Sequence, residues 1–458
     1  MFLGGVFLLK ESFFPIVELI EDSIWSYFGF PLILLIGIYF TFRSGFAQIR
    51  YFPTVVKNFI ELVMTKEKGS GIHPLKAFFA CVGGCVGIGN VVGVCVAVQL
   101  GGPGALFWLW VTALFGMMLK YCEVYLGMKF RIKDGQGGYK GGPMYFLQKV
   151  FKTNFVPYIV CLLLCVYGVE VFQFSVVVNT IAHNFVVDKA LVAGILVILV
   201  IYAALGGVKR VGSINAWIIP SFVVLYVGMG AYVFYQNFDA VPDVIARVIS
   251  SAFTGHAALG GFIGSTLLGT ISHGIRRASY SGDLGVGYAS VIHSESSSHS
   301  PEKQASLVFF DLFLDSFIIC TTTLFVILVT DAWYQPLDST MIVQSALSNY
   351  FPYMNYFMPF FLFLLGYSTI NAYFVVGLKC AEFVIGRWGK PIYIVFGAVT
   401  LFAFAFVDIY EAQMVMSLTN VLLLIVNSYG IFRLRKEISF NIKGASASVP
   451  EAKAIPAE

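Results

Sequence analysis

Apolar and polar residues are segregated along this chain into long blocks and do not alternate with a short period. Eleven blocks are predominantly apolar, and most are long enough to cross the hydrocarbon core of a bilayer as a helix of about 20 residues. They comprise residues 27–42, 77–99, 103–126, 156–182, 188–207, 214–236, 257–290, 305–330, 353–378, 391–409 and 412–432. The pattern predicts an all-α polytopic membrane protein with about eleven transmembrane helices.

The composition supports the same class. Apolar residues make up 58% of the chain and charged residues 12%, whereas soluble domains carry about 25% charged residues. No cysteine belongs to a CxxC pair or to a loop, which argues against a disulfide framework. We expect small buried hydrophobic side chains at all eight positions: Cys81, Cys85, Cys95, Cys122, Cys161, Cys165, Cys320 and Cys380.

The two ends of the chain differ from the blocks between them. Residues 1–9 are apolar but have no basic residue before them and no small-residue cleavage site after them, so we expect no cleaved signal peptide. A short amphipathic stretch with four acidic residues precedes the first block: Glu11, Glu18, Glu21 and Asp22. The polar tail, residues 441–458, cannot bury enough apolar surface to fold.

The basic residues predict the orientation, because cytoplasmic loops of membrane proteins carry an excess of Lys and Arg. Only Lys10, Lys189 and Arg247 fall on one side. The other side takes Arg43, Arg50, Lys57, Lys66, Lys68, Lys76, Lys129, Arg131, Lys133, Lys140, Lys149, Lys152, Lys209, Arg210, Lys303, Lys379, Arg387, Lys390, Arg433, Arg435, Lys436, Lys443 and Lys453. We therefore expect a cell (inner or plasma) membrane protein with its N-terminus outside and its C-terminus in the cytoplasm. The net charge of +4 then reflects topology and predicts no nucleic-acid partner.

Ten blocks remain when the first is set aside, and five plus five crossings must have opposite orientation. This count predicts an inverted repeat. The connections at residues 142–152 and 331–352 are both long and helix-like, at matching positions of the two halves. The predicted organisation is residues 1–76 (N-terminal helix, first span and basic segment), 77–238 (first repeat), 239–432 (second repeat) and 433–458 (cytoplasmic tail).

The first block of each predicted repeat is interrupted. Residues 81–93 hold five glycines and Asn90, and residues 274–287 hold Gly274, Gly282, Gly285 and Gly287; each Gly weakens a helix by up to about 1 kcal/mol relative to Ala. Paired weak helices at corresponding positions indicate a transport site. The alternative is close helix packing, because two GxxxG spacings are present, but packing does not explain the amide of Asn90.

Several short motifs together resemble the alanine or glycine:cation symporter family. They lie at residues 87–93, 101–108, 111–116 with 120–123, 141–144 and 274–277, within a likeness that runs from about residue 28 to residue 432. The resemblance implies the leucine-transporter fold with one extra N-terminal helix. It also implies that sodium, or in some members protons, drives uptake of alanine or glycine by alternating access, without a cofactor or an obligate protein partner.

The resemblance also implies which residues bind the cation and the substrate. The cation is expected at the carbonyls of Gly83 and Val86, the amide of Asn90 and the hydroxyls of Ser368 and Thr369. The substrate is expected at Gly84, Cys85, Gly87, Gly89, Gln173, Tyr280, Ser281, Gly282 and Asp283. The alternative for the hydroxyl pair is bonding to the preceding helical turn, and for Gln173 it is a hydrogen bond between helices.

Three positions depart from the family pattern. Residues 281–285 read Ser-Gly-Asp-Leu-Gly where the family has Ser-Asn-Glu-Ala-Gly, residues 375–378 replace Tyr-Tyr-Gly-Glu, and Val92 replaces Ala. The loss of an Asn side chain at Gly282 opens room. We therefore expect the pocket to tolerate a solute somewhat larger than glycine, or one whose polar group replaces the missing amide.

Charged residues inside the blocks are expected to pair, because each costs about 2.5 to 3.5 kcal/mol at a helix centre. Lys120 and Glu123 are spaced to pair with each other, and Asp315 is expected to pair with Arg276 or Arg277. Such pairs are either structural or gates that open between states. Asp311 is an extra acid near Asp315, Glu170 has no evident partner, and Asp283 is placed to reach the substrate ammonium or a cation.

Other classes of function lack their motifs. The six histidines form no HExxH or other metal-ligand spacing, and neither a nucleophile elbow nor a phosphate loop is present, which argues against an enzyme. A channel requires a continuous polar pore, whereas each half offers one central interruption. The alternative that stays open is the same fold carrying a different small solute or driven by protons.

Overall fold

The computed structural model describes residues 14–64, 71–135, 137–254 and 267–443. The predictions for a signal peptide, for the tail beyond residue 443 and for the start of block 257–290 lie outside these residues. The first part of the chain forms η1 (Trp25–Gly29), α2 (Phe30–Arg43), α3 (Ala47–Arg50), α4 (Phe52–Met64), α5 (Pro74–Cys85), η2 (Ile88–Asn90), α6 (Val92–Gly101), α7 (Ala105–Lys129), β1 (Ile132–Lys133), β2 (Tyr139–Lys140), α8 (Pro143–Phe151), α9 (Phe155–Tyr167), α10 (Val171–Phe185), α11 (Lys189–Ala204), α12 (Gly207–Gln236), η3 (Phe238–Ala240) and α13 (Val241–Thr254).

The second part is also helical. It forms α14 (Leu267–Gly282), α15 (Tyr288–Ser294), α16 (Pro301–Leu312), η5 (Phe313–Cys320), α17 (Thr321–Val329), η6 (Ala332–Tyr334), α18 (Ser339–Ser348), α19 (Met354–Ile385), η7 (Gly386–Trp388), α20 (Gly389–Phe404), α21 (Ile409–Arg433) and η8 (Arg435–Glu437). Within the described residues β1 and β2 make a single antiparallel hairpin. The connections predicted to be helix-like contain α8 and α18.

Seven helices are long and apolar enough to cross a membrane. They span Phe14–Arg43, Ala105–Lys129, Phe155–Phe185, Gly207–Gln236, Pro301–Val329, Met354–Phe404 and Ile409–Arg433; Pro74–Cys85 with Ile88–Gly101 passes as one bent span, and Lys189–Ala204 is a shorter apolar helix. The first helix begins well before the predicted block at residues 27–42, because the amphipathic stretch continues it. The all-α polytopic fold is confirmed, whereas the number of crossings and the inverted repeat stay predictions.

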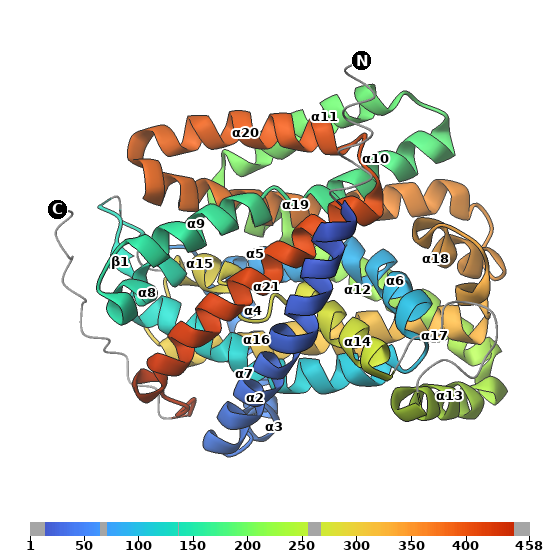
Figure 1. Ribbon diagram of the computed structural model, residues 1–458, viewed down its shortest axis with the longest axis horizontal. Helices are drawn as coiled ribbons and strands as arrows, with labels where there is room; N and C mark the ends of the chain where they lie inside the picture. Colours follow the sequence, from blue (N-terminus) through green and yellow to red (C-terminus); the bar gives the residue numbers. More distant parts are fainter. Residues whose placement is uncertain (1–13, 65–70, 136, 255–266, 444–458) are drawn as a thin grey trace.

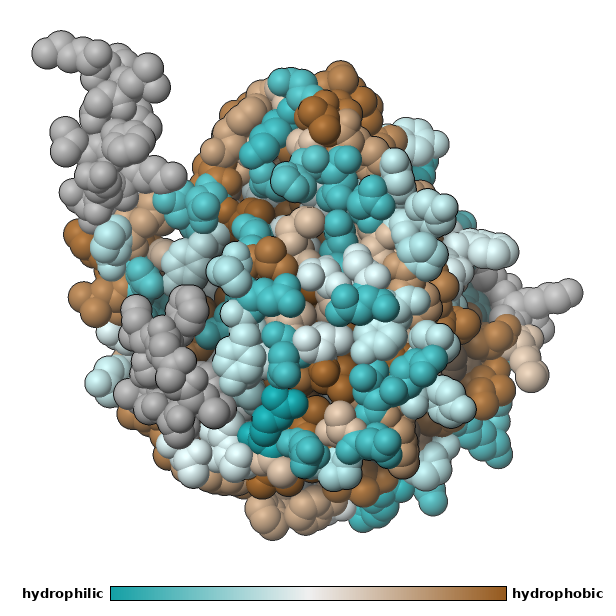
Figure 2. All heavy atoms as spheres, turned by 90° about the vertical axis from the view of Figure 1, so that its right-hand side faces the viewer, coloured by the Kyte–Doolittle hydropathy of each residue, from teal (hydrophilic) through white to brown (hydrophobic). Residues whose placement is uncertain are grey.

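The long helices α7, α9, α19 and α20 run along the horizontal axis of Figure 1, with β1 and α8 at the left end and α13 and α18 at the right end. Figure 2 shows the right-hand end face-on: hydrophilic residues cover most of its centre, and hydrophobic residues gather toward the outline. On the flanks, large apolar side chains are exposed, among them Ile198, Val224, Val395 and Val399. This distribution suits a bundle whose ends face water and whose sides face lipid.

The two interrupted blocks lie in the middle of the bundle. Helix α5 packs against α12 and α19, while α14 packs against α7 and α6, and every residue of α15 is buried. Close approach is possible because small residues face the contact. A Cβ at Gly127 of α7, for example, would lie 2.7 Å from the Ser290 Cβ of α15. The breaks therefore meet inside protein and not at the lipid boundary, where irregular backbone would be costly.

Candidate functional site

The first break, residues 86–91, separates α5 from α6 with a bend of 49°. Val86 and Gly87 are extended, and the short helix η2 follows. Two backbone N–H groups of this break are bound by side-chain amides: Gly87 donates to Asn90 Oδ1 at 3.1 Å, and Ile88 donates to Gln173 Oε1 at 3.0 Å. Amide oxygens thus replace the helical acceptors that the break removes.

The second break, residues 283–287, separates α14 from α15. Asp283 has a positive φ of 50°, and Gly285 and Gly287 follow with φ of 71° and 101°. Glycine adopts this region freely and Asp tolerates it, which explains why the chain turns here. The predicted breaks at both glycine-rich positions are therefore present.

Asp283 links the two breaks. Its Oδ1 accepts hydrogen bonds from Tyr167 at 3.0 Å and Tyr373 at 2.5 Å, and its Oδ2 accepts one from the Cys85 thiol, the last residue of α5, at 3.3 Å. Asp283 is fully buried. Since a thiol is a weak donor, Oδ2 is the carboxylate oxygen with capacity for a further donor.

Three of the predicted cation ligands lie together where α5 contacts α19. The Gly83 carbonyl accepts hydrogen bonds from Ser368 at 3.3 Å and Thr369 at 2.9 Å, and all three residues are buried. Thr369 also bonds to the Leu365 carbonyl of the preceding turn at 3.1 Å, so the alternative hydrogen bond is present as well. A Cβ at Gly87 would lie 2.4 Å from Thr369 Oγ1, which explains the glycine there.

Asn215 on α12 adds an amide to this cluster. A Cβ at Gly83 would lie 1.9 Å from Asn215 Nδ2 and 2.7 Å from Ser368 Oγ, so the amide and the hydroxyl flank the same backbone atom. Asn215 is fully buried, and neither its oxygen nor its nitrogen has a hydrogen-bond partner among the described residues. An unpaired buried amide costs free energy, and a bound cation would satisfy its oxygen.

Asn90 does not join the Gly83 cluster through any hydrogen bond of the described residues. Its amide nitrogen donates to Asp315 Oδ1 at 2.6 Å, and Ser281 donates to the same oxygen at 2.5 Å. Asn90, Ser281 and Asp315 thus connect the first break to α14 and η5. In this arrangement Asn90 stabilises the break, and its side-chain oxygen accepts the hydrogen bond from the Gly87 N–H.

Glu170 has a partner that the sequence did not indicate. It lies between α9 and α10 with a positive φ of 52°, and Tyr280 donates to its Oε1 at 2.5 Å. Three residues later, Gln173 holds Ile88 of the first break, which is the hydrogen bond between helices anticipated as its alternative role. Of the two predicted substrate residues, Tyr280 therefore contacts Glu170 and Gln173 contacts the first break.

The predicted ion pairs are wrong. Lys120 pairs with Asp311 at 2.6 Å and not with Glu123, whose Oε1 accepts the Ser290 N–H at 3.1 Å. The reason is the rotation of α7, which aims Lys120 at α5 and α16. No ion pair joins Asp315 to either arginine in the described part of the chain.

The two arginines differ from each other. Arg276 pairs with Glu21 at 2.8 Å and Asp22 at 2.6 Å, both on the N-terminal helix. Arg277 makes no ion pair with any described residue. Two acids of the amphipathic stretch, for which the sequence indicated no partner, therefore pair with Arg276.

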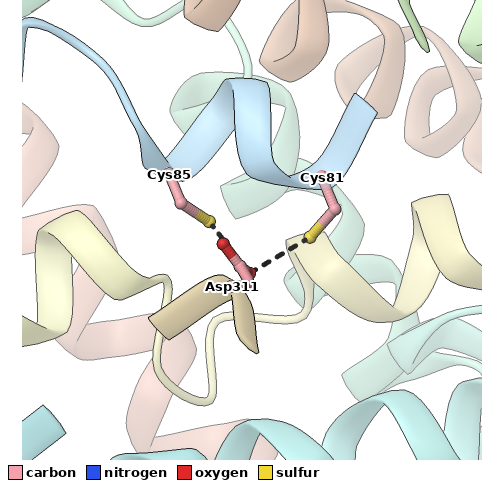
Figure 3. A group of neighbouring side chains, drawn as sticks. All are labelled: Cys81, Cys85 and Asp311. Carbon is pink, nitrogen blue, oxygen red and sulfur yellow. Dashed lines mark hydrogen bonds between the residues drawn. The ribbon is translucent and has the colours of Figure 1, made fainter. Parts of the chain in front are cut away.

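Figure 3 shows Cys81 and Cys85 of α5 pointing toward Asp311 of α16, the group whose ligand atoms lie within 4.8 Å of one another. Such a set would suit a soft metal ion. However, the Lys120 ammonium lies 2.6 Å from Asp311 Oδ2 and 3.0 Å from Cys85 Sγ. A second cation would meet strong repulsion, so this cluster fits a buried ion pair better than a metal site.

At three of the predicted substrate glycines, a neighbouring side chain fills the space beside the Cα atom. A Cβ at Gly84 would lie 2.1 Å from the Tyr288 hydroxyl, one at Gly89 would lie 2.3 Å from Arg277 Nη2, and one at Gly282 would lie 2.4 Å from Leu312 Cδ2. The Leu312 side chain thus fills the space that the missing side chain of Gly282 would leave. The expectation that this glycine opens space for a larger solute does not fit this arrangement.

Sequence reasoning missed Tyr167, Tyr373 and Asn215. Tyr373 lies one helical turn after Thr369, so helical spacing offered a signal for it. Tyr167 lies at the end of α9 just before the break at Gly168. Asn215 is a single amide at the start of an otherwise apolar block, and only the packing of α12 on α5 shows what it faces.

Comparison with known proteins agrees with this arrangement. The profile of the sodium:alanine symporter family matches residues 10–448. The sodium/alanine symporter AgcS of Methanococcus maripaludis is 29% identical, with 83% of this chain and 86% of that protein covered. The probable sodium/glutamine symporter GlnT of Bacillus subtilis is 30% identical, with 93% and 90% covered.

The fold has solved counterparts as well. The crystal structure of MhsT in complex with L-phenylalanine matches with a TM-score of 0.58 over 80% of this chain and 90% of that chain, at 14% identity. At that identity the likeness concerns the fold, which is that of the leucine transporter. Family, relatives and fold thus describe a multi-pass membrane transporter and not an enzyme, and they support cation-coupled amino acid transport. The chain belongs to the sodium:alanine symporter family.

Proposed function

We propose that this protein is a sodium-coupled symporter that brings a small neutral amino acid into the cell by alternating access. The observation that carries the proposal is the cluster of Gly83, Ser368 and Thr369 at the first break. Its carbonyl and hydroxyl oxygens suit a hard cation such as sodium. The Val86 carbonyl and Asn215 are the further ligands we propose, because they lie at the same break and beside the same glycine.

The substrate is proposed to bind between the two breaks. The N–H groups at the start of α6 suit its carboxylate, and Asp283 Oδ2 suits its ammonium group. Gln173 and Tyr280 would then border the side chain. Since Cys85 of α5 contacts Asp283 and Gly83 of α5 contacts the hydroxyl pair, both ligands act on α5. Coupling requires that they stabilise the same conformation.

The energetics of this scheme are sufficient for accumulation. One sodium ion that crosses a potential of about 100 mV supplies roughly 2.3 kcal/mol. At about 1.4 kcal/mol per tenfold, that corresponds to a gradient of roughly 40-fold. A sodium concentration difference adds to it.

Uptake into proteoliposomes with an imposed sodium or proton gradient tests the proposal. Radiolabelled alanine, glycine and glutamine should be ranked under each gradient. Accumulation of at least one of them only with inward sodium is expected. Uptake driven by protons alone, or downhill flux without coupling, would contradict sodium symport.

The proposal includes the orientation. Lys140 in β2 should face the cytoplasm and Asp338, which caps α18, should face outside; the two elements lie at opposite ends of the bundle (Figure 1). Single cysteines at the two positions, on a background without accessible native thiols, should react with an impermeant reagent from opposite sides of the membrane. Reaction from one side would overturn the topology.

A further inference from the structure

Arg277 is a buried guanidinium group that has no counter-ion among the described residues. It lies in α14, its side chain is 4% exposed, and it makes neither a hydrogen bond nor an ion pair with any described residue. Its Nε is buried without a partner. Its neighbour Arg276 pairs with two acids. Carboxylates are therefore present close to Arg277, but they bind Arg276.

The protein is shaped around this guanidinium. Gly89 of η2 and Gly93 of α6 face it: a Cβ at these positions would lie 2.3 Å from Nη2 and 2.2 Å from Nη1. The spacing that suggested helix packing therefore makes room for a charged side chain. On another side, Arg277 Cζ lies 5.2 Å from the centroid of the Tyr280 ring, which is a cation–π distance.

A cavity of about 70 Å³ adjoins the guanidinium. It lies between the N-terminal helix, α6, α14 and α21, and its lining includes Glu21, Gly93, Arg276 and Tyr280. The Glu21 carboxylate in this lining accepts hydrogen bonds from Arg276 and Ser417. Such a volume holds about two waters or one carboxylate-sized group. Arg277 is six residues before Asp283, so the cavity lies roughly 9 Å along α14 from the second break.

An unpaired cation inside a membrane protein is costly and is expected to have a functional partner. The planar guanidinium fork matches a carboxylate in a bidentate arrangement, which a point charge does not. A small monovalent anion is the kind of ligand that this guanidinium would bind. A transported zwitterion supplies one in its carboxylate, and a free halide would be the other source.

We infer that Arg277 and this cavity form a vestibule site that binds the carboxylate of the amino acid on its way to the two breaks. The inference rests on the proposed function. The ammonium end of the solute would point inward, toward Glu170 and Asp283, with Tyr280 between the vestibule and these acids. Arg277 is then a binding residue that captures the solute and not a structural counter-ion.

The test uses the full chain in lipid nanodiscs with L-alanine and its carboxamide, alaninamide, as probes. Arg277→Gln should weaken alanine binding at least tenfold and leave the weak binding of alaninamide unchanged within twofold. Arg277→Lys should recover only part of the loss, because it keeps the charge without the fork. Arg247→Gln is the matched control, because Arg247 pairs with Asp331 and does not line the cavity; it should change the ratio of the two affinities less than twofold.

Two measurements keep the test decisive. If Arg277→Gln folds poorly, Arg277→Ala with added guanidinium ion should regain alanine binding in a concentration-dependent way, which loss of fold would not allow. Replacement of chloride by gluconate should leave alanine binding unchanged. An equal loss of both probes in Arg277→Gln, or loss of alanine binding in gluconate, would overturn the carboxylate site.

Failure of the inference is distinguishable from failure of the proposed function. If the parent protein accumulates no amino acid under a sodium gradient, the proposed function fails. If the parent does so and Arg277→Gln keeps the parent's affinity for alanine, the function stands and the vestibule site is wrong.

Discussion

The two breaks at the centre of this transporter solve the same problem with different chemistry. In the first break, freed backbone groups are bound by neutral amides and hydroxyls, from Asn90, Gln173 and Thr369. In the second, the backbone turns at positive φ and the side chain of Asp283 collects the polar neighbours. In the proposed scheme the neutral break binds a cation through its oxygens, and the acidic break binds an ammonium group through its charge. The comparison teaches that two helix breaks in one bundle can differ in the chemistry of the side chains that stabilise them.

Neutralising Asp283 should have the largest effect on this contrast. Asp283→Asn keeps the αL-tolerant side chain but removes the charge proposed to bind the ammonium group. A lost hydrogen bond to a charged group is worth up to about 3 kcal/mol, so we expect uptake at low substrate concentration to fall roughly 100-fold.

Initial rates of alanine uptake in proteoliposomes measure this effect. Tyr167→Phe is the matched control, because it removes one donor to Asp283 and leaves the charge; its rate should stay within fivefold of the parent. Full activity of Asp283→Asn would remove the distinction between the acidic and the neutral break.

Removing the hydroxyl pair tests the first break alone. Ser368→Ala with Thr369→Ala should raise the sodium concentration for half-maximal uptake at least tenfold, because two proposed cation ligands are lost while the backbone carbonyls remain. Thr419→Ala deletes a helical hydroxyl that bonds only to its own helix at Val415 and should leave sodium dependence unchanged. Equal sodium dependence of the double variant and the parent would show that the pair is not a ligand set.

Substitution of Asn215 tests the first break further and should have a smaller effect on sodium dependence. Asn215→Ala should raise the half-maximal sodium concentration about threefold to fivefold, which corresponds to the roughly 1 kcal/mol of one neutral polar contact. Asn179→Ala removes an amide that bonds to Ser175 on its own helix and is the control. A shift in substrate affinity without a shift in sodium dependence would place Asn215 in the substrate site instead.

An effect similar in size to that of Asn215 is expected at Gly282, beside the acidic break. Asn at this position collides with Leu312, so Gly282→Asn alone should lower the yield of folded protein. Combined with Leu312→Ala, it should fold and change the preference between alanine and glycine about fivefold, as one polar contact of about 1 kcal/mol allows. Competition assays measure the ranking. An unchanged ranking in a folded double variant would assign specificity to Gln173 and α10.

Much of the site's location was predictable because it depends on local properties. Helix propensity along the chain is enough to find both breaks, whereas Ser368 and Thr369 were predicted from the resemblance to a known family. The partners of charged residues were not predictable in the same way. Lys120 had Glu123 at a suitable spacing, yet it binds Asp311, because the direction of a side chain depends on how its helix is rotated in the bundle.

The sequence by itself determined the class of protein, the helical blocks and the places where two of them weaken, since hydropathy and glycine content act over a few residues. Only the tertiary structure decided that Asp283 meets Tyr167 and Tyr373, that Asn215 stands beside Gly83, and that Arg277 pairs with no acid in the described part of the chain. These contacts join residues far apart in the chain. In a low-dielectric interior each charge or amide takes the neighbour that packing supplies, and that neighbour is a property of the assembled bundle and not of any segment.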